Sequence, residues 1–284
     1  MLCMTLPPLI APLKSRALIS VSGPDWRSFL QGLVTQDVET LVPGELRFGG
    51  LLTPQGKLLF DLFLFGGDEG CLVDVAADGR EGLIQRLMLY RLRAKVEIKP
   101  DDGAVLAAWQ APAPHGQGWA DDPRLHALGA RGYGAAPPAG AIMTDEAAYN
   151  VHRLALGVPD SARDCPPETA YPIEANFDLL AGIDFKKGCF VGQETTSRMK
   201  RRGAIKNRML PIRFEGPPPP MGAEVLAGEL RAGQVLTGAD GAAMALLRLD
   251  RIEGAVLTAE GRPVKVERPS YLDRDEATPT RPVS

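Results

Sequence analysis

K-K-G-C-F-V-G-Q-E-T-T-S-R-M-K-R-R-G-A-I-K-N-R, residues 186–208, is the stretch around which the rest of the sequence is organised. It contains eight basic residues and one acid, Glu194, whereas the 284-residue chain has 32 basic and 35 acidic residues and a net charge of −3. The stretch therefore carries +7 and the remainder of the chain −10. Positive charge concentrated in this way on an acidic protein is typical of a docking surface for an anion.

Cys189 is the residue of this stretch best suited to chemistry. It follows Gly188 and precedes Gly192, Gln193 and Glu194. Neighbouring cations favour the thiolate, which is the nucleophilic and metal-binding form of cysteine. A lone cysteine among glycines is also common as a small buried residue of a tight turn, so both interpretations stay open at this point.

The other cysteines, Cys3, Cys71 and Cys165, lie far from Cys189 and from one another. No C-x-x-C pair and no histidine spacing predicts a zinc site. Neither a disulfide framework nor an iron–sulfur site built by this chain alone is expected, because both need several cysteines close together. We predict no resident metal and at most one functional thiol, Cys189.

The composition, 45% hydrophobic and 24% charged, is that of an ordinary globular protein. No apolar run is long enough to span a bilayer, and the strongest, residues 58–65, is interrupted by Asp61. Residues 1–14 contain three prolines and lack the basic start of a signal peptide. These features predict a cytoplasmic protein without a membrane partner.

Residues 1–104 are predicted to form one α+β module of ferredoxin-like topology. Residues 54–56, P-Q-G, have the chemistry of a hairpin turn. The expected strands are 17–22, 46–53, 57–65, 71–76 and 95–99, and the expected helices are 26–33 and 79–92.

Residues 105–208 are predicted to form a second α+β module. Its expected elements are a strand at 105–110, a strand within 121–130, a helix at 145–156, and a loop, short helix and strand within 186–208. Residues 209–284 are predicted to hold a small C-terminal β-barrel or sandwich. Its expected strands are 223–226, 229–236, 242–249 and 264–267, and a disordered tail is expected from about residue 273.

Asp61 is a carboxylate within an otherwise apolar strand. If it faces the core, it needs a partner or a raised pKa, and it is then a candidate functional residue. If the strand is half exposed, Asp61 lies on the solvent side, which is the interpretation that we favour from sequence.

The ligand of the basic stretch is predicted to be an anionic small-molecule tail, such as polyglutamate, rather than RNA. Phe190 is its one aromatic residue, so stacking on the bases of a single strand is poorly supported and direct nucleic-acid binding is not expected. The cations are Lys186, Lys187, Arg198, Lys200, Arg201, Arg202, Lys206 and Arg208.

The segment K-G-C-F-V-G-Q-E at 187–194 resembles the signature K-G-C-[YF]-x-G-Q-E of the folate-binding YgfZ family, the iron–sulfur maintenance relatives of the glycine-cleavage T-protein (aminomethyltransferase). The continuation at 198–203, F-L-Q-G-L-V-T-Q-D-V at 29–38 and L-L-T-P-Q-G-K at 51–57 also resemble that family. The matches occur in the expected order, so the resemblance covers nearly the whole chain.

The resemblance implies a T-protein-like fold, with two α+β modules and a C-terminal barrel around a central channel that holds tetrahydrofolate. It implies assembly or repair of iron–sulfur clusters, including those of tRNA-modifying radical enzymes, with iron–sulfur carrier or client proteins as partners. Cys189 carries over as the functional thiol. The implied cofactor-binding residues are Lys187, Gly188, Gly192, Gln193, Glu194, Arg198 and Arg202.

Two departures separate the chain from the aminomethyltransferase branch. The segment R-L-E-x-G, whose glutamate holds the pterin there, is replaced at 153–157 by a sequence with Ala155 in place of the acid. A pair of aspartates is reduced to Asp61 alone. Because the pterin loses charge-assisted hydrogen-bond acceptors, we favour a factor that is not a classical enzyme, with Cys189 as a transient ligand or redox-active thiol. The alternative is a tetrahydrofolate-dependent one-carbon transferase with Asp61 as a second catalytic residue.

Overall fold

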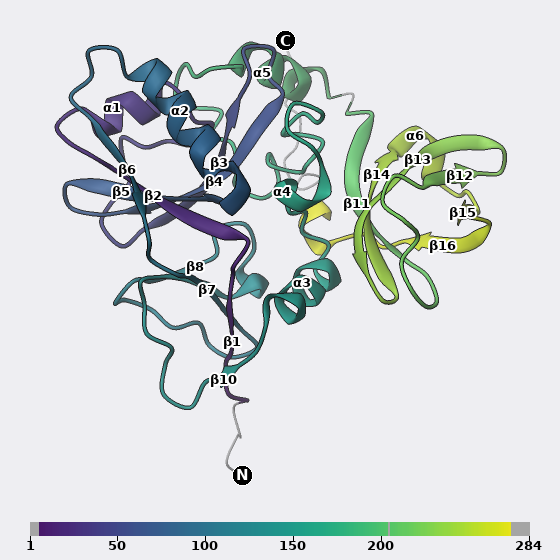
Figure 1. Ribbon diagram of the computed structural model, residues 1–284. Coiled ribbons are helices and arrows are strands. Elements are labelled where there is room, and N and C mark those ends of the chain that lie inside the picture. The colour runs from purple at the N-terminus through teal and green to yellow at the C-terminus, as the bar shows by residue number, and fades with distance from the viewer. Residues whose placement is uncertain (1–5, 204, 274–284) are drawn as a thin grey trace.

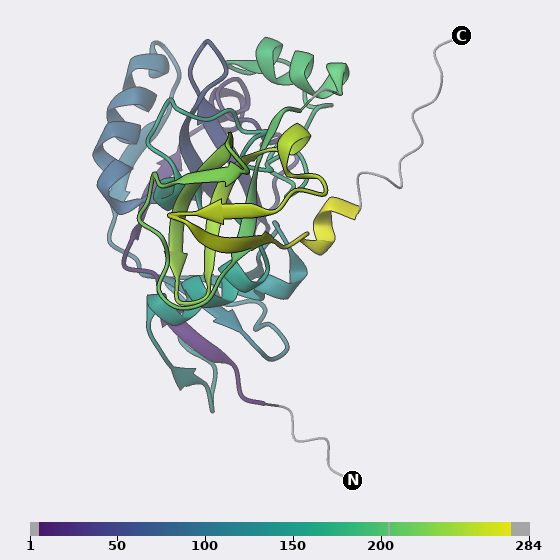
Figure 2. The ribbon, with the colours of Figure 1, turned by 90° about the vertical axis from the view of Figure 1, so that its right-hand side faces the viewer.

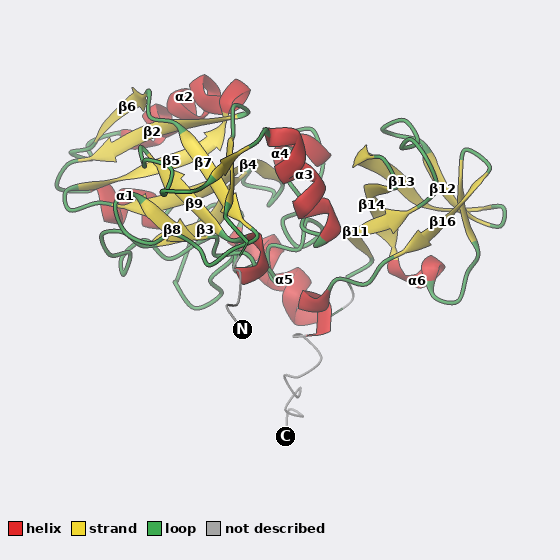
Figure 3. Cartoon of the chain, turned by 90° about the horizontal axis from the view of Figure 1, so that it is seen from below, coloured by secondary structure: helices red, strands yellow, loops and turns green. Residues whose placement is uncertain are grey.

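The computed structural model describes residues 6–203 and 205–273. Its strands form two five-stranded sheets and one closed six-stranded barrel (Figure 1). Seen from below, both sheets lie on one side of the molecule and the barrel on the other, with helices between them (Figure 3).

The first sheet has the strand order β3-β4-β5-β2-β6, and every neighbouring pair is antiparallel. Two helices, α1 (Trp26–Gln31) and α2 (Arg80–Arg91), contribute buried residues to the core on one face of this sheet, because apolar side chains recur at helical spacing in each of them. The elements are β2 (Arg16–Ser22), α1 (Trp26–Gln31), β3 (Leu46–Leu52), β4 (Leu58–Gly66), β5 (Gly70–Ala76), η1 (Ala77–Gly79), α2 (Arg80–Arg91) and β6 (Glu97–Asp101).

The second sheet has the order β10-β1-β7-β9-β8. Its strand β1 comes from the N-terminal segment and pairs antiparallel with β7 and parallel with β10. The elements of this part are β1 (Leu9–Pro12), β7 (Val105–Trp109), β8 (Trp119–Asp121), η2 (His126–Leu128), β9 (Ala130–Tyr133), β10 (Ile142–Met143), α3 (Glu146–Ala155), α4 (Ser161–Asp164) and α5 (Gln193–Arg202).

The barrel closes because β11 pairs with β14 on one side and with β16 on the other (Figure 2). A barrel of this kind leaves no open edge strand, which protects a small sheet from edge-to-edge pairing. Its elements are β11 (Asn207–Arg213), β12 (Glu224–Ala227), β13 (Leu230–Ala239), β14 (Ala242–Arg248), α6 (Leu249–Ile252), β15 (Leu257–Ala259), β16 (Arg262–Val266) and η3 (Ser270–Leu272).

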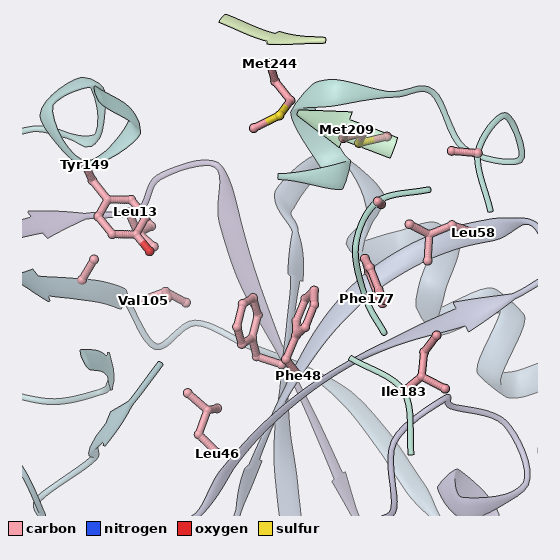
Figure 4. Packing of buried hydrophobic residues seen from close by; sticks show 14 of the residues in the cluster. Leu13, Leu46, Phe48, Leu58, Val105, Tyr149, Phe177, Ile183, Met209 and Met244 are labelled. Carbon is pink, nitrogen blue, oxygen red and sulfur yellow. The ribbon is translucent and has the colours of Figure 1, made fainter. Parts of the chain in front are cut away.

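One hydrophobic cluster joins the two sheets to the barrel. Phe48 of β3 packs on Phe177 with 4.6 Å between their ring centroids, and Met209 and Met244 reach the same cluster from the barrel (Figure 4). Phe177 belongs to a connecting segment, 165–192, that is made of turns and bends. This segment is therefore fixed by burial rather than by regular structure, and its last part is the loop that carries Cys189.

The predicted α+β class with a C-terminal barrel is confirmed, and several details differ from the sequence-based prediction. The strand expected within 121–130 is wrong: β8 and β9 flank this region, and Leu125 and Leu128 between them are buried in a separate small cluster. The short strands β1, β10 and β15 were missed, and α1 ends two residues early.

Residues 274–284 of the tail that was predicted to be disordered, and Cys3, lie outside the described residues. Within 6–203 and 205–273, none of the helices has the length and apolar character needed to cross a bilayer.

Candidate functional site

Cys189 is exposed in the loop that leads into α5. On one side of it Gly188 has a φ of +94° and open space around it. On the other side Phe190 is 7% exposed and belongs to the main core. The buried phenylalanine fixes the loop one residue beyond the thiol. Because Cys189 itself is exposed, its interpretation as a small buried residue of a tight turn is wrong.

Lys187 holds the loop on the opposite side of Cys189. Its Nζ lies 2.7, 2.6 and 2.7 Å from the backbone oxygens of Gln31, Val34 and Gln36. An ammonium group has three hydrogens to donate, so these contacts account for all of them. Partial burial lowers the pKa of Lys187 to about 8, and the nearby acid Asp37 acts in the opposite direction.

The segment after α1 forms further hydrogen bonds to the loop. The Gln31 side chain donates to the Lys187 carbonyl at 3.3 Å, and the Thr35 hydroxyl donates to the Gly182 carbonyl at 2.6 Å. The backbone N–H of Asp184 donates to the Thr35 carbonyl at 3.0 Å. The two sequence motifs at 29–38 and 187–194 are therefore one structural unit.

The third motif, at 51–57, packs under the start of α5. A Cβ atom placed on Gly192 would lie 2.6 Å from the Thr53 carbonyl oxygen, and one placed on Gly56 would lie 2.9 Å from Thr195 Cβ. Both glycines also have a positive φ, +81° and +83°, where residues with a side chain are strained. Three segments that are far apart in sequence thus meet behind the exposed thiol.

The basic stretch divides into inward-facing and outward-facing cations. Arg208 is buried and forms two 3.0 Å contacts with the carboxylate of Asp178, and Lys200 Nζ lies 3.6 Å from the same carboxylate. Lys187, Lys200 and Arg208 therefore face inward and contact other parts of the chain. The outward-facing cations are Lys186, Arg198, Arg201 and Lys206, and the side chain of Arg202 lies outside the described set.

Two of the predicted cofactor-binding residues, Gln193 and Glu194, line an open groove of about 580 Å³ at the first turns of α5. Phe185, Ser197, Lys200 and Arg201 complete its walls. The groove is bordered by two cations and one acid, and it is open to solvent rather than an enclosed pocket.

Asp61 is 5% exposed, and the preference for a solvent-exposed Asp61 was wrong. Its two oxygens lie 3.1 and 3.3 Å from one nitrogen of Arg16, a residue of β2. Burial raises the pKa of Asp61, and the positive charge of Arg16 opposes this rise. The strand β4 is buried on both faces, which is why alternation along the strand did not reveal where Asp61 points.

A buried network of ion pairs joins the two sheets around Asp74. Its carboxylate accepts hydrogen bonds from Arg16 at 2.6 Å, from Arg131 at 2.7 Å and from the Tyr133 hydroxyl at 3.1 Å. The guanidinium of Arg131 lies 3.7 Å from the ring centroid of Phe63. These residues were missed from sequence because they are scattered over four strands, and no spacing along the chain brings them together.

The residues around Asp61 do not fit a pterin. The cavity beside Asp61 measures about 90 Å³, whereas sites for drug-sized ligands are usually about 300–1,000 Å³. The carboxylate that would position the folate already accepts from Arg16. We therefore derive no step through tetrahydrofolate, and its binding stays a prediction from the resemblance.

The described residues contain no group of three or more His, Cys, Asp or Glu side chains that could hold a metal ion. Cys71 is buried and Cys165 is half-buried, and burial raises the pKa of both thiols to about 12. Cys189 is thus the exposed thiol among the described cysteines. The ion pair of Asp61 is with Arg16, and it does not involve the thiol loop.

Residues 206–274 match a family model described as CAF17, C-terminal beta-barrel domain. The chain is 33% identical to the human iron–sulfur cluster assembly factor IBA57, mitochondrial, over 282 residues, which cover 85% of this chain and 78% of that protein. It is 30% identical to the mouse protein, covering 89% and 82%. The homologue from Neurospora crassa is also 33% identical, but the chain spans 56% of its length.

A solved structure with a similar fold is the glycine cleavage system aminomethyltransferase T from Bartonella henselae. The match has a TM-score of 0.74 at 16% identity and covers 94% of this chain and 87% of that one. It confirms the predicted T-protein-like fold. The predicted cytoplasmic location is contradicted, because the relatives are named as mitochondrial proteins.

Proposed function

The chain belongs to the IBA57 family of iron–sulfur cluster assembly factors, and from this premise we propose that it supports iron–sulfur cluster assembly with Cys189 as the residue that meets the cluster. This family is related to, but not the same as, the folate-binding YgfZ family that the motifs resemble. The exposed position of Cys189 at the end of a firmly held loop is the observation that carries the proposal.

Cys189 acts as a ligand that the chain shares with a partner. A cluster is usually held by several cysteine thiolates, and this chain presents one exposed thiol among its described cysteines. The cluster is therefore cargo, and an iron–sulfur carrier or client protein supplies the remaining ligands. A redox role is less favoured, because Cys71 is buried, Cys165 is half-buried and neither is bonded to Cys189 in the structure.

The cations beside the loop favour a partner with an acidic face. Lys186, Arg198 and Arg201 are exposed around the thiol loop and the open groove. Opposite charge across an interface raises the association rate and fixes the orientation of the two proteins. Such steering brings the partner's cluster to Cys189 rather than to another surface.

The test is the substitution Cys189→Ser. We expect the variant to fold with an unchanged melting temperature, to lose rescue of a cluster-dependent enzyme in a deletion strain, and to lose the cluster absorbance of the purified complex with a loaded carrier. Cys165→Ser is the matched control and should retain both activities. Full rescue by Cys189→Ser would refute the role of the thiol.

We propose further that the clients include radical enzymes that modify tRNA. This part of the proposal rests on the resemblance of the three motifs to the YgfZ family. It is checked by measuring such a tRNA modification in the Cys189→Ser strain. The one-carbon transferase alternative is not favoured, because Asp61 is held in an ion pair beside a small cavity. Folate-dependent turnover that disappears in Asp61→Ala would reverse this preference.

A further inference from the structure

A second basic segment lies far from the thiol loop in sequence. Residues 83–96 contain Arg86, Arg91, Arg93 and Lys95 and no acid, although the whole chain has a net charge of −3. They form most of α2 and the turn into β6, and Figures 1 and 2 show α2 on the outer surface of the molecule. A local excess of cations on an acidic protein attracts anionic surfaces.

The same segment exposes large apolar side chains. Met88, Leu89 and Leu92 are 43%, 72% and 87% exposed. At helical spacing Met88 and Leu89 lie on the side of α2 opposite the buried Leu83 and Leu87. Leu92 is the residue that ends the helix, directly after Arg91. The end of α2 therefore has an apolar outer face that nothing in the described chain covers, next to a group of cations.

Leu92 is held in an unfavourable backbone conformation. It ends α2 with a φ of 43° and a ψ of −107°, at a position where helices commonly have glycine, since a side chain is strained there. Strain of this kind at an outward-facing residue suggests a function for its side chain.

The turn that carries Leu92 is firmly attached to the first sheet. Ala94 N–H donates to the Arg91 carbonyl at 2.7 Å, and Lys95 N–H donates to the Asp25 carboxylate at 2.7 Å. In the strand that follows, Glu97 pairs with Lys99 at 2.7 Å. The apolar side chains thus project from a rigid, basic corner.

We propose that this corner of α2, made of Met88, Leu89 and Leu92 with the flanking cations, docks on an anionic phospholipid surface. Interfacial helices have apolar residues on one side and basic residues beside them, and they lie on a bilayer without crossing it. The leucines enter the boundary between headgroups and acyl chains, and Arg86, Arg93 and Lys95 meet the phosphates. The sequence-based expectation of no membrane partner concerned bilayer-spanning segments, which surface docking does not require.

The test is co-sedimentation of the full chain with phosphatidylcholine vesicles that either contain or lack phosphatidylglycerol. We expect binding to the anionic vesicles alone, weakened by salt because exposed charges are screened. Leu92→Gly should lower the partition coefficient about tenfold, the loss expected when one leucine no longer enters an apolar phase. It should not lower the melting temperature, because glycine relieves the backbone strain.

Leu230→Ser, at a 63% exposed leucine of the barrel, is the matched control and should bind vesicles like the wild type. The proposal is overturned if anionic vesicles do not bind the protein, or if Leu92→Gly binds as well as the wild type. It is also overturned if the wild type forms a dimer that Leu92→Gly dissociates, since the corner would then be an interface between two copies.

Discussion

The ammonium group of Lys187 is surrounded by the backbone oxygens of Gln31, Val34 and Gln36. Gln31 is the last residue of α1, and the carbonyl groups at the end of a helix have no partner within it. Lys187 satisfies one of these groups and two more in the following turn. The lysine two residues before the motif cysteine therefore positions the loop, and it is not available to an anionic ligand.

Replacing this lysine tests its positioning role. Lys187→Met should lower the free energy of unfolding by about 2–3 kcal/mol, since charge-assisted hydrogen bonds are lost and part-buried carbonyl groups are left without a donor. We also expect faster hydrogen exchange of residues 182–191 and weaker cluster binding. Lys186→Met, at the exposed neighbour, is the control. Equal stability and exchange of the two variants would contradict the assignment.

At this scale, the sequence singled out Cys189 as the candidate thiol, which the structure shows to be exposed, but it did not show the direction of the neighbouring side chains. Charge and motif say nothing about which of the adjacent lysines Lys186 and Lys187 turns inward, because the direction depends on the carbonyl groups of a segment about 150 residues earlier. Asp61 was misplaced for a similar reason, since its partner Arg16 lies on another strand.

The loop, the turn 53–57 and α5 fit together through two glycines. A Cβ atom on Gly192 would lie 2.9 Å from Gly56 Cα, and one on Gly56 would lie 3.1 Å from the Gly192 carbonyl oxygen, so a side chain at either position would force a shift. Glycine is needed here for space and for its positive φ at once. The spacing of the helix from the hairpin, and with it the direction in which the thiol loop leaves α5, depends on this contact.

A matched pair of substitutions distinguishes the cost of steric overlap from the cost of backbone strain. Gly192→Ala and Gly188→Ala both place a side chain at a positive φ, which costs about 1–2 kcal/mol. Only the first also brings a Cβ to 2.6 Å from the Thr53 oxygen, and overpacking adds about 1–3 kcal/mol. Chemical denaturation should therefore show the larger loss for Gly192→Ala. The opposite order would mean that the turn and the helix move apart freely.

Elements with strong periodicity or turn chemistry could be predicted from the sequence, and short ones could not. The hairpin of β3 and β4 and the helices α2 and α3 follow from local patterns. The strand β15 has three residues, too few for a period of two to be recognised. The segment 165–192 has no pattern at all, because burial against three parts of the molecule determines its path.

Across the whole molecule, buried ion pairs hold the two sheets together. The carboxylate of Asp74 on β5 forms ion pairs with Arg16 of the first sheet and Arg131 of the second. Arg131 Nε also lies 3.2 Å from the carboxylate of Asp122. The network lies between the two sheets, because Arg16 belongs to the first and Arg131 to the second. Charges that satisfy one another in this way favour a fixed arrangement of the sheets over an open channel.

Breaking this network should loosen the molecule as a whole. Asp74→Asn keeps the size of the side chain but leaves Arg16 and Arg131 with too little negative charge, and removing one member of a buried pair costs about 3–5 kcal/mol. We expect a loss of this size in urea unfolding. Asp102→Asn, where a 99% exposed carboxylate faces Arg80 at 3.8 Å, should cost less than about 1 kcal/mol. Near-equal effects would mean that the sheets are held together by apolar packing alone, and the space between them would then be open to a ligand.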